Sequence, residues 1–365
     1  MPGGTAAPAS LEARILGLLL PYHRTTDPAP VSGRPDEYPE QLAQIRQFTE
    51  AGEPVLFTLP GFPCKSPNPA KVLGHLPDEG ERLSLAFLDR LCARVGEIYG
   101  PGARMLICSD GHIFGDLINV PDAHIDAYGD ALRAMIRRAD LRHLDTFDLR
   151  QVYGDLPHEA YGEHGEDGER GEDGERGEDV RRGRRGEHDA YDRCGEHGQY
   201  DWRGEYGQSS QYSQYDEMRS RATDEYAPEL AALRVLTRTD EETTRLYRGI
   251  TRFLVEDTTG HTGSRSALQR DCRARAYGVI ARSRAWGDLI AVRHPRSVRL
   301  SIHPQRPGAA KFGIRLLESA DAWATPWHST VLRRRDGSAA LMRRVDAERL
   351  GRLVLRDGRP SHYAE

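Results

Sequence analysis

The stretch GERLSLAFLDRLCARVGEIYGPGARMLICSD, residues 80–110, joins a helix pattern directly to a strand pattern. Apolar residues first recur at three- and four-residue spacing, which predicts an amphipathic helix. Gly-Pro-Gly then ends this helix, because glycine and proline in succession interrupt the helical backbone. The apolar run that follows predicts a buried strand, and the strand ends at Asp110. The stretch therefore predicts one helix-strand unit of an α/β fold.

The same alternation continues on both sides of this unit. VLFTLP at 55–60 predicts a buried strand before the helix, and residues 38–51 predict a helix before that strand. Downstream, residues 122–140 predict a second long helix, and HLDTFDL at 143–149 predicts a third strand. Strands that alternate with helices indicate a parallel or mixed sheet with helices packed on its faces.

A low-complexity segment interrupts this pattern. From Gly162 the chain reads GEH GED GER GED GER GED, and a basic RRGRR and a Tyr/Gln/Gly/Ser-rich stretch follow. The triplets lack the prolines of collagen, and almost nothing in the segment can be buried to offset the entropy lost on ordering. We therefore predict a disordered insertion over 156–222, between the N-terminal half (1–155) and the C-terminal half (223–365) of one catalytic domain.

The C-terminal half begins with helix patterns and ends with strand patterns. Residues 224–257 predict two helices, and residues 271–292 continue as helix. Four stretches then predict strands separated by turns: SVRLSIHPQ, AKFGIRLL, PWHSTVLRR and ALMRRVDAERL. These strands could complete the sheet that the first half begins.

Charge and cysteine content bound the class of protein. The 365 residues include 51 Lys and Arg against 56 Asp and Glu, a net charge of −5, which gives no general attraction to nucleic acid or membrane. The five cysteines form no CxxC pair, and the first residues lack a signal-peptide pattern. These features predict reduced thiols and a cytoplasmic location.

Polar, ionisable residues follow three predicted strands within a few positions of their ends. VLFTL leads into Cys64, Lys65 and Ser66, RMLICS leads into Asp110, and VRLSI leads into His303. Ligands of open α/β sheets bind beyond the carboxyl ends of the strands, so these residues form a candidate site. The prolines around Lys65 predict a loop that holds this amine in place.

Each of these residues also has an ordinary interpretation. Lys65 could be a surface lysine, Cys64 a buried filler, Asp110 part of an Asp-Gly turn, and His303 a structural histidine. His328 sits among large apolar residues, where a core role is also open. The spacing of Asp, His and Asp in SDGHIFGD is not typical of a metal site, and we predict no metal. No P-loop, GxGxxG, HExxH or GxSxG pattern is present.

Five short sequence segments, in the same order along the chain, resemble those of a known family. LPGFPCKSPNPAKVLG, SDGHIFGDLI, VRLSIHPQ, KFGIRLL and TPWHSTVL are similar to segments of the isonitrile synthases, within the wider group named for pyoverdine and dityrosine biosynthesis. The resemblance covers about 40–150 and 225–335, and the low-complexity insertion departs from it. It implies a Rossmann-like α/β fold.

The resemblance also implies a reaction. Isonitrile synthases convert an α-amino acid, often tyrosine or tryptophan, into its isonitrile, with C2 of ribulose 5-phosphate as the carbon source. No redox cofactor is needed, so ribulose 5-phosphate is the only co-substrate expected. A fungal branch forms N-formyl tyrosine instead, and bacterial members are often paired with an iron(II)/2-oxoglutarate-dependent oxygenase.

The resemblance and the strand ends together select two groups of site residues. Those expected to take part in catalysis are Lys65, Asp110, His112 and Asp116. Those expected to bind substrate are Cys64, Ser66, Asn68, His303, Lys311, Arg315 and His328. We expect Lys65 to contact the phosphosugar, Asp110 and His112 to exchange protons, and Asp116 to orient His112 or hold a hydroxyl.

Two alternative functions that involve no reaction of an amino acid remain open. A phosphosugar-binding protein without turnover could use the same cationic residues, although binding alone would need fewer ionisable groups. A nucleic-acid-binding reading rests on RRGRR and RRRDGSAALMRR, but these basic runs lie beside acidic ones and lack interleaved aromatic residues. We therefore predict no nucleic-acid partner and no membrane association.

Overall fold

The computed structural model describes residues 9–25, 33–154, 214–318 and 324–365. Met1–Asp155 and Tyr215–Glu365 form one compact unit. The prediction of disorder over 156–213 lies outside the described residues. Residues 214–222 are described, and there the prediction is wrong: they belong to helix α7, Gln214–Tyr226, which buries Tyr215, Met218 and Ala222.

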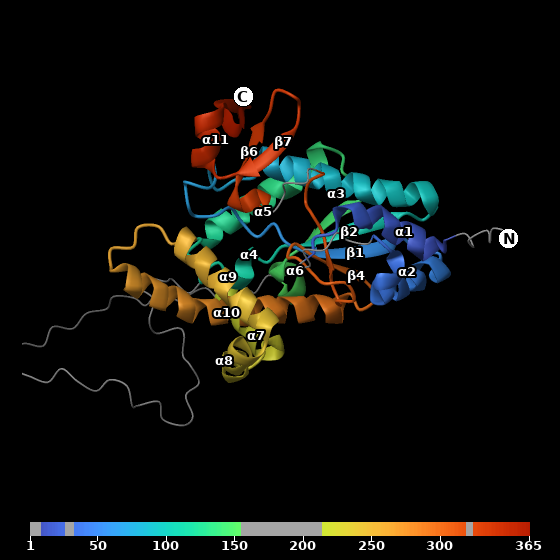
Figure 1. The fold of residues 1–365 in the computed structure, drawn as a ribbon, viewed down its shortest axis with the longest axis horizontal. Coiled ribbons are helices and arrows are strands. Elements are labelled where there is room, and N and C mark those ends of the chain that lie inside the picture. The colour runs from blue at the N-terminus through green and yellow to red at the C-terminus, as the bar shows by residue number, and fades with distance from the viewer. Residues whose placement is uncertain (1–8, 26–32, 155–213, 319–323) are drawn as a thin grey trace, which may run out of the picture. The chain divides into compact units, whose positions relative to one another are not determined.

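A five-stranded parallel sheet forms the centre of this unit (Figure 1). Its strands, in the order β3-β2-β1-β4-β5, are β3 (Leu144–Phe147), β2 (Ala103–Cys108), β1 (Val55–Pro60), β4 (Val298–Ser301) and β5 (Phe312–Gly313). All neighbouring pairs are parallel, with Val55 opposite Ala103 and Leu300 opposite Phe312. The predicted α/β class with a mostly parallel sheet is confirmed.

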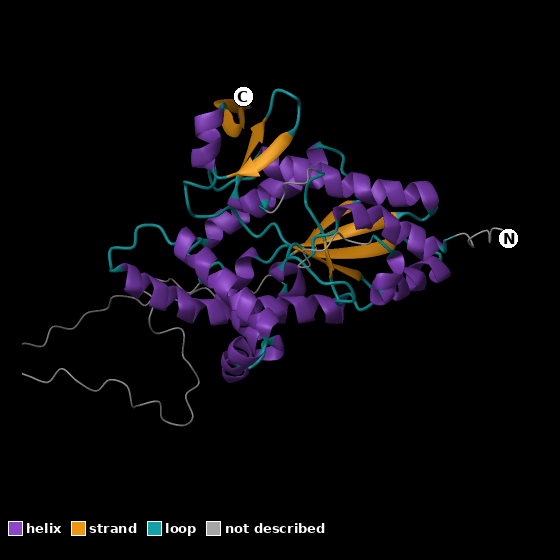
Figure 2. Ribbon diagram, in the orientation of Figure 1, coloured by secondary structure: helices purple, strands orange, loops and turns teal. Residues whose placement is uncertain are grey.

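Helices cover both faces of the sheet (Figure 2). The helices between consecutive strands on one side are α3 (Glu79–Ile98) and α5 (Asp122–Arg138), and α1 (Leu11–Leu19) and α2 (Pro39–Ala51) join them. The chain then returns through α10 (Arg265–Arg293) to β4, on the other side of β1. Because parallel crossovers are right-handed, this reversal places α10 on the opposite face from α3.

Local sequence signals set the helix boundaries. Asp78 and Glu81 form a capping box at the start of α3, and the Ser10 hydroxyl accepts the amide of Ala13 at the start of α1. Gly52, with φ 68°, ends α2, and Gly102, with φ 73°, follows the Gly-Pro pair that ends α3. The predicted stop at Gly-Pro-Gly is confirmed, since α3 ends at Ile98, and glycine adopts positive φ angles without strain.

The C-terminal strands do not all join the central sheet. A separate four-stranded sheet has the order β7-β6-β9-β8 and contains β6 (Thr330–Arg333), β7 (Ala339–Met342), β8 (Arg352–Arg356) and β9 (Arg359–Ala364). The expectation of one completed sheet is therefore right only for β4 and β5. The stretch ALMRRVDAERL is a strand only at its start, and its second half forms α11 (Arg344–Leu350).

The remaining elements surround the strand ends. They are η1 (Leu20–Tyr22), η2 (Pro35–Glu37), α4 (Gly111–Phe114), α6 (Leu149–Tyr153), α8 (Leu230–Thr239), α9 (Glu241–Asp257) and η3 (Pro326–His328). The largest core cluster lies between the sheet and the α1–α2–α3–α5 layer. A second cluster joins α4, α9 and α10 beside Cys64, so the loop after β1 lies where the two clusters approach each other.

Candidate functional site

The candidate site lies where β1, β2 and β4 end. Their last residues are Pro60, Cys108 and Ser301, and because the strands are parallel, the loops that follow meet at one edge of the sheet. The order of strands along the sheet reverses between β1 and β4. Open α/β sheets bind ligands at such a reversal, beyond the carboxyl ends of the strands.

Contacts with distant segments fix the loop after β1. The amide of Ser66 donates to the carbonyl oxygen of Trp327 at 2.8 Å, and the Ser109 hydroxyl donates to the carbonyl oxygen of Phe62 at 3.0 Å. Phe62 has a φ of 55°, which is strained for a non-glycine residue, and its ring packs against that of Trp327 at 5.0 Å. Tertiary contacts therefore hold the loop in addition to its prolines.

Gly111 allows the start of α4 to approach this loop. A β-carbon at this position would lie 2.2 Å from the carbonyl oxygen of Pro63 and 2.7 Å from a side-chain carbon of Ile125. Real side chains do not approach backbone this closely, so any larger residue must displace one of the two segments. Gly111, in the sequence SDGH, thus sets the distance between the loops after β1 and β2.

Lys65 is buried, and three acceptors surround its ammonium group. Its Nζ lies 2.8 Å from carboxylate oxygens of both Asp78 and Glu81 and donates to the carbonyl oxygen of Pro326 at 3.0 Å. Burial alone would lower the pKa of Lys65, but the two carboxylates outweigh it and raise the pKa. The side chain is 0% exposed and ties the loop to α3 and η3. Its contact with a phosphosugar stays a prediction.

The same cluster contains one more negative than positive group. Burial raises the pKa of Asp78 to about 7, and the neighbouring Glu81 adds to this rise while Lys65 opposes it. The Tyr128 hydroxyl donates to Glu81 at 3.3 Å from the α5 side. Four elements thus share this buried network, and the sequence indicated only its lysine.

A second buried carboxylate, Asp257 at the end of α9, organises the rest of the loop. It accepts the Ser66 hydroxyl at 2.8 Å and the ammonium of Lys71 at 2.5 Å. The Asn68 side-chain amide donates to the carbonyl oxygen of Glu256 at 2.7 Å. Ser66 and Asn68, both predicted to bind substrate, therefore anchor the loop on α9 in this structure.

Cys64 is 3% exposed and lies between two acidic groups. Burial raises the pKa of its thiol strongly, and the charges of Asp110 and Asp257 raise it further. A thiol in these surroundings stays protonated and is not a nucleophile. The charges of Asp110 and Asp257 therefore both act on this thiol.

Asp110 follows β2, and one of its carboxylate oxygens lacks a hydrogen-bond partner among the described residues. Its Oδ1 is buried and has no hydrogen-bond partner among the residues that the structure describes. Burial raises the pKa of this carboxyl to about 7. A carboxyl group with such a pKa can both donate and accept a proton at neutral pH.

His112 and Asp116 make contacts with neighbouring helices. The His112 Nε2 lies 3.3 Å from Asp126, and its ring stacks on Tyr215 of α7 at 3.7 Å. Asp116 accepts a hydrogen bond from Arg282 of α10 at 2.7 Å. The side chains of His112 and Asp116 thus have helix residues as partners; the catalytic roles of His112 and Asp116 stay predictions.

His303, two residues beyond β4, is exposed by surface area although protein surrounds it. Burial lowers the pKa of His303 to about 4, and the charges of Arg24, Lys311 and His328 lower it further. The exposed area shows that the ring can be reached, and the low pKa shows that it is neutral at pH 7. The charges of Lys311 and His328 thus act on His303; that the three residues bind substrate stays a prediction.

Lys311 has a cationic neighbour that the sequence did not indicate. The strand register places it beside Arg299, and both side chains come within 3.6 Å of the point that a β-carbon of Gly287 would occupy. Among the described residues, neither forms an ion pair within 4.0 Å. Burial lowers the pKa of Lys311, and Arg299 adds to this effect. The two together suit an anionic ligand.

Arg315 contacts the segment that follows α1. Its guanidinium donates to the carbonyl oxygen of Pro21 and approaches the ring of Tyr22 at 5.8 Å. Arg24 takes the position nearer to His303 and donates to the carbonyl oxygen of Ile302 at 2.5 Å. The sequence therefore missed Arg24, which lies in an unremarkable segment with no strand before it.

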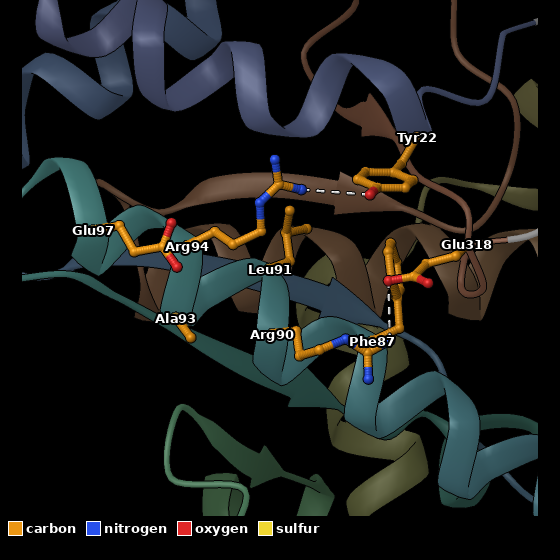
Figure 3. Close-up of a pocket in the computed structure, with 8 residues that line it drawn as sticks. All are labelled: Tyr22, Phe87, Arg90, Leu91, Ala93, Arg94, Glu97 and Glu318. Carbon is orange, nitrogen blue, oxygen red and sulfur yellow. Dashed lines mark hydrogen bonds and ion pairs between the residues drawn. The ribbon is translucent and has the colours of Figure 1, made fainter.

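A surface pocket on α3 lies apart from these residues (Figure 3). Its lining residues are Tyr22, Phe87, Arg90, Leu91, Ala93, Arg94, Glu97 and Glu318. Arg94 reaches toward the Tyr22 hydroxyl at 3.4 Å, and Arg90 pairs with Glu318 at 3.1 Å. Both arginines of the lining thus have partners, and no predicted site residue lines the pocket.

Asp257 and Lys71 are the clearest omissions of the sequence analysis. One signal was present: Asp257 is an acid at the C-terminus of a helix, where the helix dipole disfavours negative charge. No comparable signal marks Lys71, because its partner is 186 positions away in the chain.

Three further observations concern the described residues only. No three His, Cys, Asp or Glu side chains there are arranged to hold a metal ion. No helix in that part of the chain is long and apolar enough to cross a bilayer. The free cysteines are all buried and are Cys64, Cys92, Cys108 and Cys272; Cys194 lies outside the described residues.

Comparisons with known proteins agree with this architecture. The family model "Pyoverdine/dityrosine biosynthesis protein" matches residues 45–354. The chain is 40% identical to an L-tyrosine isonitrile synthase of Pseudomonas aeruginosa, over 97% of this chain and 94% of that protein. It is 35% identical to the L-tryptophan isonitrile synthase AmbI2 of Fischerella ambigua, over 88% of this chain and 81% of that protein.

A solved structure is similar as well. The crystal structure of the PvcA protein from Pseudomonas aeruginosa aligns with a TM-score of 0.77 at 40% sequence identity. The alignment covers 97% of this chain and 99% of that one.

Proposed function

Because the chain belongs to the pyoverdine/dityrosine biosynthesis protein family, we propose that it is an isonitrile synthase. The substrate is the α-amino group of tyrosine or tryptophan, and ribulose 5-phosphate donates the carbon. The observation that carries this proposal is the 40% identity to an L-tyrosine isonitrile synthase over nearly the whole chain. The ionisable groups at the strand ends supply the chemistry that such a reaction needs.

Proton transfer at neutral pH is the first requirement. The substrate amine must add to the sugar ketone, and the adduct must lose water, which needs a group that can protonate the departing hydroxyl. Asp110, whose pKa burial raises to about 7, is partly protonated at that pH. We assign it this acid role, with its buried and unpartnered Oδ1 facing the reacting atoms.

Recognition of anionic groups is the second requirement. Lys311 and Arg299 lie side by side without an ion-paired acid among the described residues, and Arg24 lies near His303. We assign these cations to the phosphate of the sugar and the carboxylate of the amino acid. His303 is neutral at pH 7, so it serves as a hydrogen-bonding group and contributes no charge.

The other predicted site residues take supporting roles in this proposal. Lys65, Ser66 and Asn68 hold the loop after β1 through buried contacts with α3 and α9. His112 and Asp116 join α4 to α7 and α10. Ribulose 5-phosphate is the only co-substrate, and an iron(II)/2-oxoglutarate-dependent oxygenase that processes the product stays a prediction, as does the cytoplasmic location.

The test is to incubate the protein with ribulose 5-phosphate and each of the twenty amino acids. Mass spectrometry and a tetrazine trap would identify an isonitrile. With heavy carbon at C2 of the sugar, the label must appear in the isonitrile carbon. Turnover that leaves the label elsewhere would exclude ribulose 5-phosphate as the donor, and no turnover with any amino acid would exclude the proposed activity.

Two alternatives give different results in the same experiment. An enzyme of the formyl-tyrosine branch would yield a product heavier by one water, which does not react with tetrazine. A phosphosugar-binding protein would bind ribulose 5-phosphate in calorimetry without consuming it. The raised pKa of Asp110 favours turnover, because a binding protein gains nothing from a buried, unpartnered carboxyl group.

A further inference from the structure

Asp257 ends α9 with a buried carboxylate that contacts three side chains. Its Oδ1 lies 2.5 Å from the ammonium of Lys71, and its Oδ2 accepts the Ser66 hydroxyl at 2.8 Å and lies 3.5 Å from Nδ1 of His328. A negative charge at a helix C-terminus opposes the helix dipole, so α9 gains no stability from it. The three contacts are what this residue provides.

His328 is oriented by its surroundings. Its ring packs edge-on against Phe253 at 4.8 Å, and Trp327 precedes it in η3. The Nδ1 atom is buried and forms no hydrogen bond among the described residues, with the Asp257 carboxylate 3.5 Å away, while the side chain as a whole keeps 29% of its surface exposed. The Nε2 edge is therefore the part of the ring that a substrate can reach.

The Asp257–His328 pair borders the region assigned to the reaction. The charge of His328 lowers the pKa of His303, and Asp257 acts together with Asp110 on the Cys64 thiol. These couplings place the pair within electrostatic reach of both the proposed acid and the end of β4. The titratable groups that interact with His328 are Asp257 from α9 and His303 from the loop after β4. Lys71 acts on His328 indirectly, because it pairs with Asp257.

We propose that Asp257 is the positioning residue that holds Nδ1 of His328, leaving Nε2 to remove a proton from the substrate's α-ammonium group. This inference rests on the proposed function, because the amino acid must lose that proton before its nitrogen can attack the ketone. The N–H bond breaks, the electron pair stays on the substrate nitrogen, and the proton moves to Nε2. The resulting imidazolium is stabilised by the carboxylate of Asp257.

His328 and Lys71 keep this carboxylate ionised. Burial alone would raise the pKa of Asp257, but the contacts with His328 and Lys71 outweigh it and hold the pKa below its ordinary value. The carboxylate is thus charged before substrate arrives. The histidine is then the only member of the group that changes its protonation state during the reaction.

The orientation can be tested by NMR of nitrogen-labelled histidine, without any turnover. In the native protein, neutral His328 should carry its proton on Nδ1. In Asp257→Asn, the Nε2 tautomer should become populated, because an amide can donate to Nδ1. Asp89→Asn is the matched control: Asp89 holds Nδ1 of His143 at 3.0 Å, before β3 and away from the site. It should change the His143 tautomer and leave turnover unaltered.

The catalytic part is tested by kinetics over a range of pH. At neutral pH, Asp257→Asn should lower turnover by about tenfold to 10⁴-fold, and His328→Gln by about 10²- to 10⁴-fold. Both losses should shrink at alkaline pH, where more of the free amine is already neutral. His328→Gln keeps a hydrogen-bonding group beside Asp257, so it tests the base even if Asp257→Asn does not fold.

The outcomes separate this inference from the proposed function. An unchanged His328 tautomer in Asp257→Asn would overturn the positioning role, whatever the enzyme's activity. Equal losses in His328→Gln at neutral and alkaline pH would overturn the role as a base. A native protein that forms no isonitrile would remove the proposed function and the base with it, while the tautomer result would still decide the contact between Asp257 and His328.

Discussion

The groups that follow β1 and β2 differ in how well their charges are satisfied. After β1, Lys65 is enclosed by Asp78, Glu81 and a carbonyl oxygen, so the ammonium group has no open side. After β2, Asp110 is only partly buried as a residue, but its Oδ1 is buried and has no hydrogen-bond partner among the described residues. The sequence presents both as polar residues at strand ends. The comparison teaches that position at a strand end does not decide whether a charged group is satisfied: the partners of Lys65 enclose it, whereas Asp110 keeps one carboxylate oxygen without a partner in the described part of the chain.

Asp110→Asn tests the chemical side of this comparison and should have the largest effect. It should lower turnover by about 10²- to 10⁴-fold, because an amide cannot transfer the proton. It should not destabilise the fold at neutral pH. A carboxyl whose pKa is higher in the folded than in the unfolded state makes the protein less stable as pH rises, because the folded state resists its ionisation. The free energy of unfolding of the native protein, relative to that of Asp110→Asn, should therefore fall between about pH 4 and about pH 7.

Urea unfolding of both proteins at pH 5 and pH 8 measures this difference. If the native protein became more stable than Asp110→Asn as the pH rose, the carboxyl would have a partner that favours its charged form. The contrast with Lys65 would then be lost.

Lys65→Met tests the supporting side. Removing the ammonium leaves two buried carboxylates without compensation, which should lower the free energy of unfolding by about 3–5 kcal/mol. Arg34→Ala is a suitable control, since its ion pair with Asp36 has side chains 69% and 61% exposed and should contribute at most about 1 kcal/mol. A stable Lys65→Met protein with a raised KM for ribulose 5-phosphate would return Lys65 to substrate contact.

Gly111→Ala tests whether the spacing between the two loops matters. The added β-carbon would lie 2.2 Å from the Pro63 carbonyl oxygen, so it should lower stability by about 1–3 kcal/mol and reduce turnover. Gly17→Ala, in helix α1 with no atom within 4 Å of the added carbon, should instead raise stability by up to about 1 kcal/mol. Thermal unfolding compares the two, and equal effects would show that the close approach is not needed.

Asn68→Ala should have the smallest effect. It removes the hydrogen bond to the Glu256 carbonyl oxygen and should cost about 1 kcal/mol of stability, with KM for both substrates unchanged. Steady-state kinetics of the folded variant provide the check. An increase in KM for the sugar alone would mean that Asn68 leaves α9 to bind substrate.

The sequence by itself determined the elements and the edge of the sheet where the site lies. Spacing of apolar residues predicted α3 and α5, Gly-Pro-Gly at 100–102 predicted the end of α3 at Ile98, and apolar runs predicted β1 and β2, because local backbone energetics and burial patterns depend on neighbouring residues. Polar residues after those strands marked Asp110 and His303, since parallel strands deliver their ends to one edge.

Only the tertiary structure decided which charges meet. His112 and Asp116 are close to Asp110 in sequence, yet they pair with α7 and α10. Lys71 and Asp257 are far apart in sequence, yet they lie 2.5 Å apart. A charged side chain's role depends on whether burial leaves it a partner, and long-range packing sets those partners. Sequence therefore places ionisable groups at the strand ends, whereas three-dimensional packing separates the satisfied ones from those free to react.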